Sequence, residues 1–388
     1  MKIALVVPGR FHAFDLGRAL IGVGHDVTLL TNYPKWAAAR FGFPAERVRS
    51  FWVHGVVARA AWPLRQHGLA VYPEAALSRT FGAWAARELA KDRWDVVHGW
   101  SGVAEETLRM HPARCHLIMR GSAHIRTQAQ ILADEEARTG APQDKPSPWM
   151  IAREEREYDL ANRIVTLSSF AYDTFRANGV PPDRLEKLTL GARLSAFSPD
   201  RRVVDARRAR ILSGAPLRIL FVGALSFQKG FWDLHRIVSE LAGPRFHFRL
   251  VGPLVPETAA LVRDLASKAE VVGKQPQHLL PRWYADADVF VFPTIQDGFA
   301  VVLAQAHASA LPILTTTNSS GPDLLRAGET GWVLPIRSAD AFIDRLRWCD
   351  AHRDELADMV ARCAADPQLR DWTDVAADFT RVCASMLS

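Results

Sequence analysis

The 388-residue chain has few cysteines and no long apolar run, and each shortage excludes a class of protein. Its four cysteines show neither close pairing nor metal-ligand spacing, so we expect reduced, mostly buried thiols of a cytoplasmic protein. No stretch approaches the ~18 apolar residues of a membrane-spanning helix. The opening MKIALVVPGRF predicts a first strand and its turn rather than a signal peptide.

A dinucleotide fingerprint is also missing, and the positive charge is spread out. No G-x-G-x-x-G follows the first predicted strand, which argues against a nicotinamide or flavin dinucleotide. The net charge of +6 could suit an anionic partner, but only the Asp200–Arg210 stretch is locally dense in arginine. We therefore expect no nucleic-acid partner. A content of 48% hydrophobic and 23% charged residues is ordinary for a globular chain long enough for two domains.

Strand-like and helix-like segments alternate along the whole chain, which predicts a doubly wound α/β architecture. In the first half we expect strands at Ile3–Val7, Val27–Thr31, Asp95–His98, His116–Met119 and Ile164–Leu167, and a last one ending at Thr189–Gly191. In the second half we expect them at 217–223, Phe246–Gly252, Val271–Gly273, Val289–Phe292 and Ile313–Thr316. Between the halves lies a polar, Arg-rich stretch, 191–218, which is the best candidate for a domain boundary.

The most informative segment is Pro293–Pro312. An apolar strand pattern runs into Asp297-Gly298, a helix-like run follows from Phe299 to Ser309, and Pro312 opens the next strand. Ligands of open α/β sheets bind at the carboxyl ends of strands, and a helix N-terminus suits a phosphate. Asp297 and Gln305 are separated by ~12 Å if the interval is helical, which suits the two ends of one elongated ligand.

This segment resembles the carboxylate motif of retaining glycosyltransferases of the GT-B fold, especially glycosyltransferase family 4. That family usually reads Glu-Gly-Phe-Gly, then Glu-Ala. The corresponding residues here are Asp297, Gly298, Phe299 and Ala300, then Gln305 and Ala306. The resemblance implies that Asp297 contacts hydroxyls of the donor sugar and Gln305 the ribose. Asp shortens the reach by ~1.5 Å, and Gln loses a charge but still donates and accepts hydrogen bonds.

The resemblance implies two facing Rossmann-like domains with a cleft between them. Residues 1–195 would form the acceptor-side domain, joined by a carboxyl-terminal helix at 371–388. Residues 196–370 would bind the nucleotide sugar.

A second motif, LFVGALSFQKGFWDL, resembles the diphosphate-binding turn of the same family. A strand ends at Gly223 and Lys229 precedes a helix, so we expect Lys229 to neutralise the donor diphosphate. Ala224 replaces the usual arginine, and Arg10 or Arg120 could compensate from the other domain. The alternative for Lys229 is a solvated loop lysine.

A third motif, MRGSAHI, resembles a segment of a bacterial subset of the family. It makes His124 a candidate contact to the donor sugar, with Arg120 and Ser122 on the same loop. His124 could instead be a hydrogen-bonding surface residue, and His98, which also ends a strand, is its rival.

Further candidates come from three other loops. Gly9 lets the first loop approach a ligand without a Cβ. Phe11, His12 and Phe14 could face the acceptor, and the alternative for the two phenylalanines is to anchor the core. The stretch 318–335 resembles a phosphate-binding loop, which makes Ser320 and Gly321 candidates. The base is expected beside Gly273–Gln275, a range that includes Lys274.

The function implied is retaining transfer of a sugar from a nucleotide diphosphate sugar, of UDP or GDP type, to a glycan or lipid-linked glycan in polysaccharide biosynthesis. The resemblance implies no cofactor and no obligatory metal. Two alternatives stay open: a degenerate relative acting as a binding or scaffold subunit, because both motif glutamates and the diphosphate-binding arginine are replaced, and a nucleotide-sugar epimerase. With a lipid-linked acceptor, residues 52–65 could make a peripheral contact with the inner face of the membrane.

Overall fold

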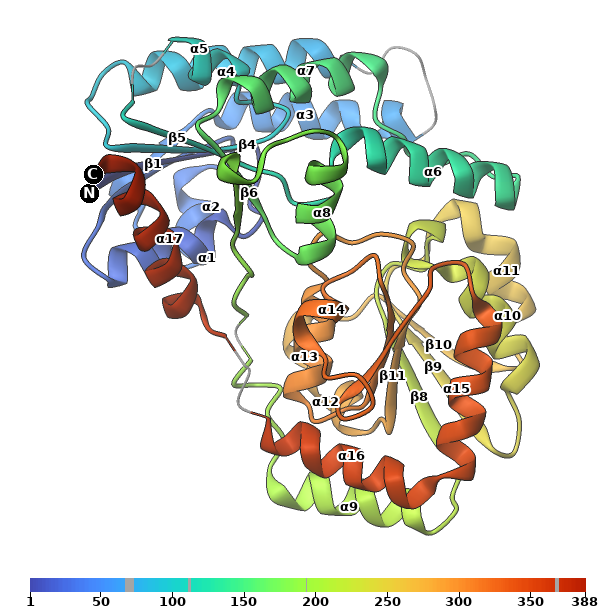
Figure 1. The fold of residues 1–388 in the computed structure, drawn as a ribbon. Helices are drawn as coiled ribbons and strands as arrows, with labels where there is room; N and C mark the ends of the chain where they lie inside the picture. Colours follow the sequence, from blue (N-terminus) through green and yellow to red (C-terminus); the bar gives the residue numbers. More distant parts are fainter. Residues whose placement is uncertain (67–72, 111–112, 193, 367–369) are drawn as a thin grey trace.

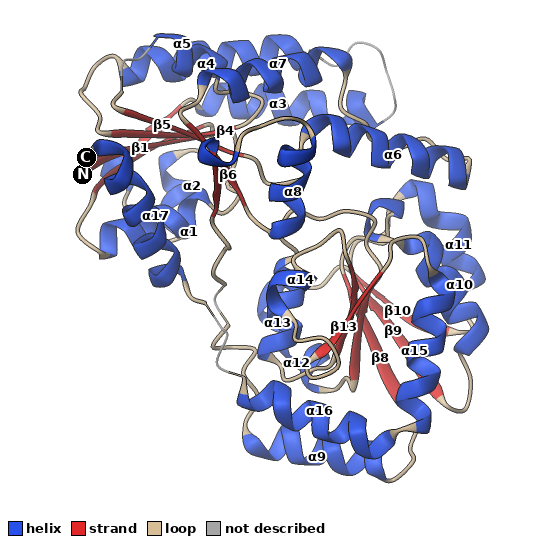
Figure 2. Cartoon of the chain, viewed as in Figure 1, coloured by secondary structure: helices blue, strands red, loops and turns tan. Residues whose placement is uncertain are grey.

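Two parallel sheets, one in each half of the chain, form the framework of the protein (Figure 1). The computed structural model describes residues 1–388 except 67–72, 111–112, 193 and 367–369. Helices cover both faces of each sheet (Figure 2). The predicted doubly wound α/β architecture is confirmed. In the described part of the chain, no helix is long and apolar enough to cross a membrane.

The first sheet has the strand order β3-β2-β1-β4-β5-β6-β7. Its strands are β1 (Lys2–Val7), β2 (Asp26–Thr31), β3 (Val48–Ser50), β4 (Val96–Trp100), β5 (Cys115–Met119), β6 (Arg163–Thr166) and β7 (Leu185–Lys187). The first five predicted strands are confirmed, to within two residues at each end. The last one was predicted too late in the chain, because β7 ends at Lys187. The edge strand β3 was missed because three residues give too short a pattern.

The second sheet has the order β10-β9-β8-β11-β12-β13. Its strands are β8 (Leu217–Val222), β9 (Phe246–Val251), β10 (Ala269–Gly273), β11 (Val289–Phe292), β12 (Ile313–Thr316) and β13 (Gly331–Leu334), and only β13 was not predicted. The strand order reverses between β1 and β4, and again between β8 and β11. Loops at such switch points form the binding crevice of open α/β sheets.

The helices fall into two sets. The first domain holds α1 (Ala13–Gly22), α2 (Lys35–Arg40), α3 (Trp52–Gln66), α4 (Glu74–Leu89), α5 (Glu105–Met110), α6 (Ile125–Thr139), α7 (Pro148–Leu160) and α8 (Ser169–Ala177). The second holds α9 (Arg201–Leu212), α10 (Phe231–Leu241), α11 (Ala259–Asp264), α12 (Leu280–Ala285), α13 (Val301–Ala308), α14 (Gly321–Leu324), α15 (Ala339–Ala351) and α16 (Arg353–Ala365).

The middle of the stretch predicted as a polar boundary is helix α9, Arg201–Leu212. Asp200 caps it by accepting the Val203 N–H. Arg207 is fully buried and donates to the carbonyl oxygens of Ser309 and Tyr284. The arginine-rich stretch is therefore part of the second domain's core packing, because the carboxyl ends of α12 and α13 offer acceptors to a buried guanidinium.

Helix α17 (Trp372–Leu387) returns to the first domain, so both termini lie beside its sheet (Figure 1). Phe379 packs against His98 of β4, and Thr380 Oγ1 lies 2.8 Å from His25 Nε2. The chain passes between the domains twice, once before α9 and once before α17. The two connecting segments are in contact, because the Ala192 N–H donates to the Arg370 carbonyl at 3.2 Å.

Candidate active site

A cavity of about 920 Å³ lies between the two domains, at the carboxyl ends of strands from both sheets. We call it the main cavity. Cations dominate its charged lining, which contains one carboxylate, Asp15, paired with Arg18. Such a lining favours an anionic ligand. The cationic residues that line it are Arg10, Arg18, Arg40 and Arg120.

The predicted site residues divide between the wall of the main cavity and its surroundings. Arg120, Ser122, Phe299 and Gln305 line it. Lys229 and Asp297 are not part of its wall, but the loop of Asp297 reaches the wall two residues later, at Phe299. The second domain therefore contributes Phe299 and Gln305 of this motif to the cavity, and Asp297 lies just behind the wall.

Asp297 is held in the loop between β11 and α13. Its N–H donates to the Asn318 carbonyl at 2.8 Å, and its Oδ1 accepts the Phe299 N–H at 3.2 Å. Helix α13 begins at Val301, two residues later than predicted, because this side-chain acceptor turns the backbone before the helix. Asp297 is therefore a fixed loop residue rather than part of a continuous helix with Gln305.

Lys229 lies beside Asp297, with its Nζ 2.6 Å from Asp297 Oδ2. It ends a short 3₁₀ turn, Phe227–Lys229, after Gly223 and before α10, as the motif predicts. Gly230 follows with φ 78°, and a Cβ there would overlap the Pro293 carbonyl oxygen. Only glycine lets the lysine turn approach the loop of Asp297 so closely.

Gln305 presents an amide to the main cavity from α13. The side chain is 5% exposed, and its Oε1 accepts the Tyr284 hydroxyl at 3.0 Å. Phe299 and Ala300, the other residues of this motif, are buried beside it. The remaining donor positions of the amide can serve a ligand hydroxyl.

The loop of Asp297 touches the first domain directly. A Cβ on Gly298 would overlap the Gly121 carbonyl oxygen. Ser122 Oγ donates to Gln296 Oε1 at 2.6 Å, while Gln296 Nε2 is buried without a partner among the described residues. The carboxylate motif of the second domain thus meets the MRGSAHI motif of the first across the domain boundary.

Two arginines of the first domain reach the main cavity in different ways. Arg120 has its Nε 3.2 Å from Glu154 and donates to the Ala123 carbonyl, so it is already engaged. Arg10 lies over the Phe41 ring at 4.1 Å and has no carboxylate partner in the described part of the chain. Of the two arginines offered as replacements for the arginine missing at Ala224, Arg10 is the more available.

The structure does not bring His124 to the main cavity. It caps α6, with its Nδ1 accepting the Arg126 N–H at 3.3 Å, and its ring packs on Tyr158 and Phe175. Burial lowers the pKa of His124 to about 4. Its rival His98 is fully buried in β4, where burial lowers its pKa to about 3. Both rings are therefore neutral at pH 7.

The first loop separates its candidates. Gly9 adopts φ 138°, and its carbonyl accepts the Thr31 hydroxyl at 3.0 Å. Phe11 is 61% exposed with φ 38°, a conformation that costs energy in a bulky residue, and it lines the main cavity together with His12. Phe14 is a core residue. Of the two phenylalanines, the structure places Phe11 at the cavity and Phe14 in the core.

The remaining candidates lie around the second domain's strand ends. Ser320 and Gly321 are buried at the start of α14, and Ser320 Oγ has no hydrogen-bond partner among the described residues. Pro322 occupies the first turn of α14. Lys274 is exposed directly after β10, next to Gly273 with φ 76°.

Sequence reasoning missed several lining residues. Trp100 and Trp372 flank the main cavity from β4 and α17, and Gln277 faces them from the second domain. Trp100 Nε1 and His12 Nε2 are buried without hydrogen-bond partners in the described structure, so both can serve a ligand. Trp100 could have been found as an aromatic residue at the end of a predicted strand. No pattern in the neighbouring sequence indicates that Trp372 lies beside the first domain.

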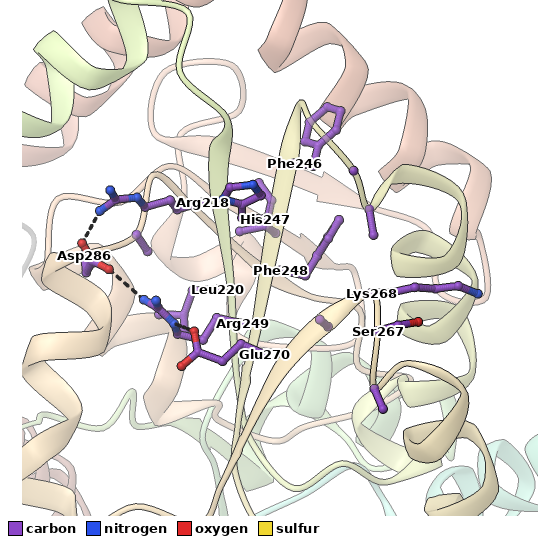
Figure 3. Close-up of a pocket in the computed structure, with 16 residues that line it drawn as sticks. Arg218, Leu220, Phe246, His247, Phe248, Arg249, Ser267, Lys268, Glu270 and Asp286 are labelled. Carbon is purple, nitrogen blue, oxygen red and sulfur yellow. Dashed lines mark hydrogen bonds and ion pairs between the residues drawn. The ribbon is translucent and has the colours of Figure 1, made fainter.

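A separate cavity of about 620 Å³ lies at the opposite, amino ends of β8, β9 and β10 (Figure 3). Figure 3 shows Arg218 and Arg249 on either side of Asp286, and both pair with it. Asp288, two residues on, pairs with Arg210. Asp286 and Asp288 are therefore both paired with arginines, at the end of the sheet opposite to the main cavity.

Known proteins resemble both halves of this chain. Residues 10–192 match the family model described as Glycosyltransferase Family 4, and residues 216–350 match Glycosyl transferases group 1. WcaL of Escherichia coli strain K12, named as a putative glycosyltransferase of colanic acid biosynthesis, is 29% identical over 197 residues. That alignment covers 47% of this chain and 47% of WcaL, so the match spans about half the length of that relative.

Solved structures match over the full length. Sucrose-phosphate synthase from Thermosynechococcus elongatus superposes with a TM-score of 0.73 at 19% identity, covering 100% of this chain and 99% of that one. HepE of Anabaena, solved in complex with UDP-glucose, superposes with a TM-score of 0.68 at 12% identity, covering 99% and 100%. The chain therefore belongs to the glycosyltransferases of the GT-B fold, its first domain matching Glycosyltransferase Family 4 and its second the glycosyl transferases group 1.

Proposed function

We propose that this protein transfers a sugar from a nucleotide diphosphate sugar to a glycan or lipid-linked glycan, with retention at the anomeric carbon. The observation that carries the proposal is the main cavity, where arginines of the first domain face the segment of Asp297 and Gln305 of the second. HepE was solved in complex with UDP-glucose, which supports a UDP-type donor; a GDP-type donor is the other candidate.

In this proposal the diphosphate contacts Lys229 and Arg10. Lys229 would exchange part of its contact with Asp297 for a phosphate oxygen, and Asp297 would then accept a hydroxyl of the donor sugar. Gln305 and its partner Tyr284 would hold the ribose. Cations fixed where the leaving diphosphate gains charge supply transition-state stabilisation without a metal ion.

Retention would proceed on one face of the sugar. A double displacement needs a free carboxylate beneath the anomeric carbon. Among the described residues that line the main cavity, the one carboxylate, Asp15, is paired with Arg18. Departure of the diphosphate and attack by the acceptor within one ion pair fits that lining better, with the acceptor positioned from the side of Phe11 and His12.

The proposed acceptor class rests on the name of a similar protein. WcaL is named for colanic acid biosynthesis, which supports an acceptor in polysaccharide assembly. Two other functions predict different products. An epimerase would change the donor without an acceptor, and a scaffold subunit would bind nucleotide, if at all, without turnover; family membership favours the enzyme.

A thermal-shift screen against UDP, GDP, ADP, dTDP and their sugar conjugates tests the donor site. A ligand at 100 times its Kd stabilises the fold by about 2.7 kcal/mol, so one nucleotide should raise the Tm clearly. Lys229→Ala and Asp297→Ala should each lose most of that shift. Lys268→Ala, at the rim of the distant 620 Å³ cavity, is the matched control and should keep it.

Two results would contradict the proposal. One is a wild-type protein that responds to no nucleotide, and the other is a pair of folded Lys229→Ala and Asp297→Ala variants that turn over donor like the wild type. Turnover measured with EDTA present would separate the metal-free mechanism from a metal-dependent one.

A further inference from the structure

The fold brings two of the four cysteines together. Cys115 begins strand β5 and Cys383 lies on helix α17, and both side chains are fully buried. Met386 follows Cys383 by one turn on the same side of the helix, and its Sδ lies 3.4 Å from Cys115 Sγ. The thiols of Cys115 and Cys383 contact each other. Two cysteines far apart in the sequence are therefore neighbours beside the first sheet.

The position of Cys383 is set by contacts on either side of it along α17. After it, the Leu387 carbonyl oxygen accepts a hydrogen bond from Arg114 at 2.8 Å. Before it, Thr380 Oγ1 lies 2.8 Å from His25 Nε2. These two contacts fix the helix against the amino end of β5, so the packing of α17 itself holds Cys383 at its partner.

Contact between the two thiols makes one of them more acidic. Contact with Cys383 lowers the pKa of the Cys115 thiol, because a thiolate on Cys115 accepts the S–H of Cys383. Burial opposes this effect and the charge of Arg163 adds to it. The same contact, together with burial, raises the pKa of Cys383. Since the thiolate is the reactive form of cysteine, Cys115 is the nucleophile of the pair.

The other two cysteines have a different environment. Cys349 on α15 and Cys363 on α16 are buried in the second domain, and burial raises the pKa of each to about 12. Both thiols therefore stay protonated at pH 7, and buried thiols of this kind are inert. They serve as controls within the same chain.

A small reagent can reach Cys115 when the last turn of α17 opens. Ala384, Ser385 and Ser388 are exposed, and Met386, which touches Cys115, is half-buried. The ends of helices fray and open locally at little cost in free energy. Opening this one turn removes Met386 from Cys115 and uncovers the thiol.

We propose that Cys115 and Cys383 form a reversible disulfide that fastens α17 to the first domain when a small disulfide is available as oxidant. The Cys115 thiolate attacks one sulfur of the small disulfide, which forms a mixed disulfide and releases one small thiolate. Cys383 then loses its proton to solvent, and its thiolate attacks Cys115 Sγ and releases the second small thiolate. The two protein thiols are oxidised, and the small disulfide is reduced to two thiols.

The disulfide would stabilise the fold without entering the main cavity. It closes a loop that contains the whole second domain, and a cross-link restricts the unfolded chain more when its loop is long. It would also hold the helix that begins with Trp372, a residue of the cavity wall. Neither cysteine lines that cavity. This inference does not rest on the proposed function.

Oxidation of the folded wild type with glutathione disulfide tests the pair directly. Free thiols titrated after denaturation should fall from four to two. Mass spectrometry of the unreduced digest should show one cross-link, between the peptides of Cys115 and Cys383. The Tm should rise by roughly 2–5 °C and return to its first value after dithiothreitol. The nucleotide-induced thermal shift should be the same before and after oxidation.

Single variants separate the steps of the reaction. Cys383→Ser should stop at the mixed disulfide, with one glutathione on Cys115 and no gain in Tm. Cys115→Ser should keep all of its remaining thiols free. Cys349→Ser removes an equally buried thiol and should still form the cross-link. The peptide map of the wild type needs no variant, so it decides the question even where a variant fails to fold.

Three outcomes would overturn the proposal. The folded wild type could keep its four thiols, or it could hold glutathione on Cys115 without closing the bond, which would place Cys383 out of reach. Oxidation could also modify Cys349 and Cys363 as fast as the proposed pair, which would show that contact between the thiols does not select the site.

Discussion

At the residue scale, the ion pair of Lys229 and Asp297 is the central feature of the proposed donor site. The lysine's charge is partly satisfied by a carboxylate 2.6 Å away, and both side chains keep some exposure to solvent. A phosphate can therefore compete for the lysine, and the shorter Asp in place of the usual Glu still brings the carboxylate to its partner. The same two residues serve the fold and the proposed chemistry.

His98 links residue chemistry to the stability of the first domain. It is fully buried between Trp100 and Phe379 of α17, and neither ring nitrogen has a partner among the described residues. Burial lowers its pKa to about 3, because a charged ring would lose its hydration there. The folded protein keeps this ring neutral at pH values where the unfolded chain binds a proton.

Acid should therefore destabilise the protein through His98. The unfolded ring protonates near pH 6.5 and the folded ring only near pH 3, so stability falls as the pH drops below 6.5. The loss from one such group approaches ~1.4 kcal/mol per pH unit. His98→Phe should show a shallower decline in unfolding free energy between pH 6.5 and 4.5 by urea denaturation. Identical slopes in the two proteins would contradict this role.

At the element scale, Gly230 fixes how the 3₁₀ turn of Lys229 joins helix α10. It combines a left-handed φ of 78° with a backbone that passes against Pro293. The β11 loop and the lysine turn are thereby held in contact, and Ile295 N–H donates to the Gln228 carbonyl at 3.1 Å in the same region. The junction positions Lys229 and Asp297, the two charged residues of the proposed donor site.

Gly214 offers a matched comparison for Gly230. It has φ 76°, but a Cβ there would meet nothing within 4 Å. Gly214→Ala should cost only the ~1–2 kcal/mol of a left-handed alanine. Gly230→Ala should cost more, because a clash with the Pro293 carbonyl is added, and it should also abolish the nucleotide-induced thermal shift. Equal costs in the two variants, by urea denaturation, would show that the close approach is unimportant.

At the scale of the whole molecule, α6 holds the two domains together beside the main cavity. Figure 1 shows α6 of the first domain lying next to α10 of the second. Arg138 of α6 donates two hydrogen bonds to Asp233 of α10, at 2.8 and 2.5 Å. Arg337, after β13, reaches back to Glu135 of α6 at 2.8 Å. Both acids are buried, so these ion pairs are stronger than exposed ones.

Reversing the charge of Arg138 and Arg337 should open the cleft between the two domains. Arg138→Glu with Arg337→Glu places like charges at both ties, so X-ray scattering should give a radius of gyration above the roughly 21 Å of a compact chain of this length. Arg245→Glu is the control, because Arg245 pairs with Asp350 inside the second domain. It should leave the radius unchanged. An unchanged radius in the double variant would mean that other contacts hold the domains.

Much of the framework could be predicted because local patterns carry it. Ten predicted strands were found, since buried parallel strands read as apolar runs bounded by Gly and Pro. The short strands β3 and β7 offered too little pattern, and β13 was hidden in a segment interpreted as a phosphate loop. Asp297, Gln305 and Lys229 could be named from spacing and resemblance because their motifs are contiguous.

The α/β class, the two halves, the family and the motif residues at strand ends all follow from the amino-acid order. The folded molecule was needed to learn that His124 and His98 are buried away from the main cavity, that Arg207 is a core residue, and that α6 joins the domains. The physical reason is the distance along the chain between the residues that interact. Strand and turn patterns are set by neighbours along the chain, whereas burial, ion pairing and access to a cavity depend on residues that only folding brings together.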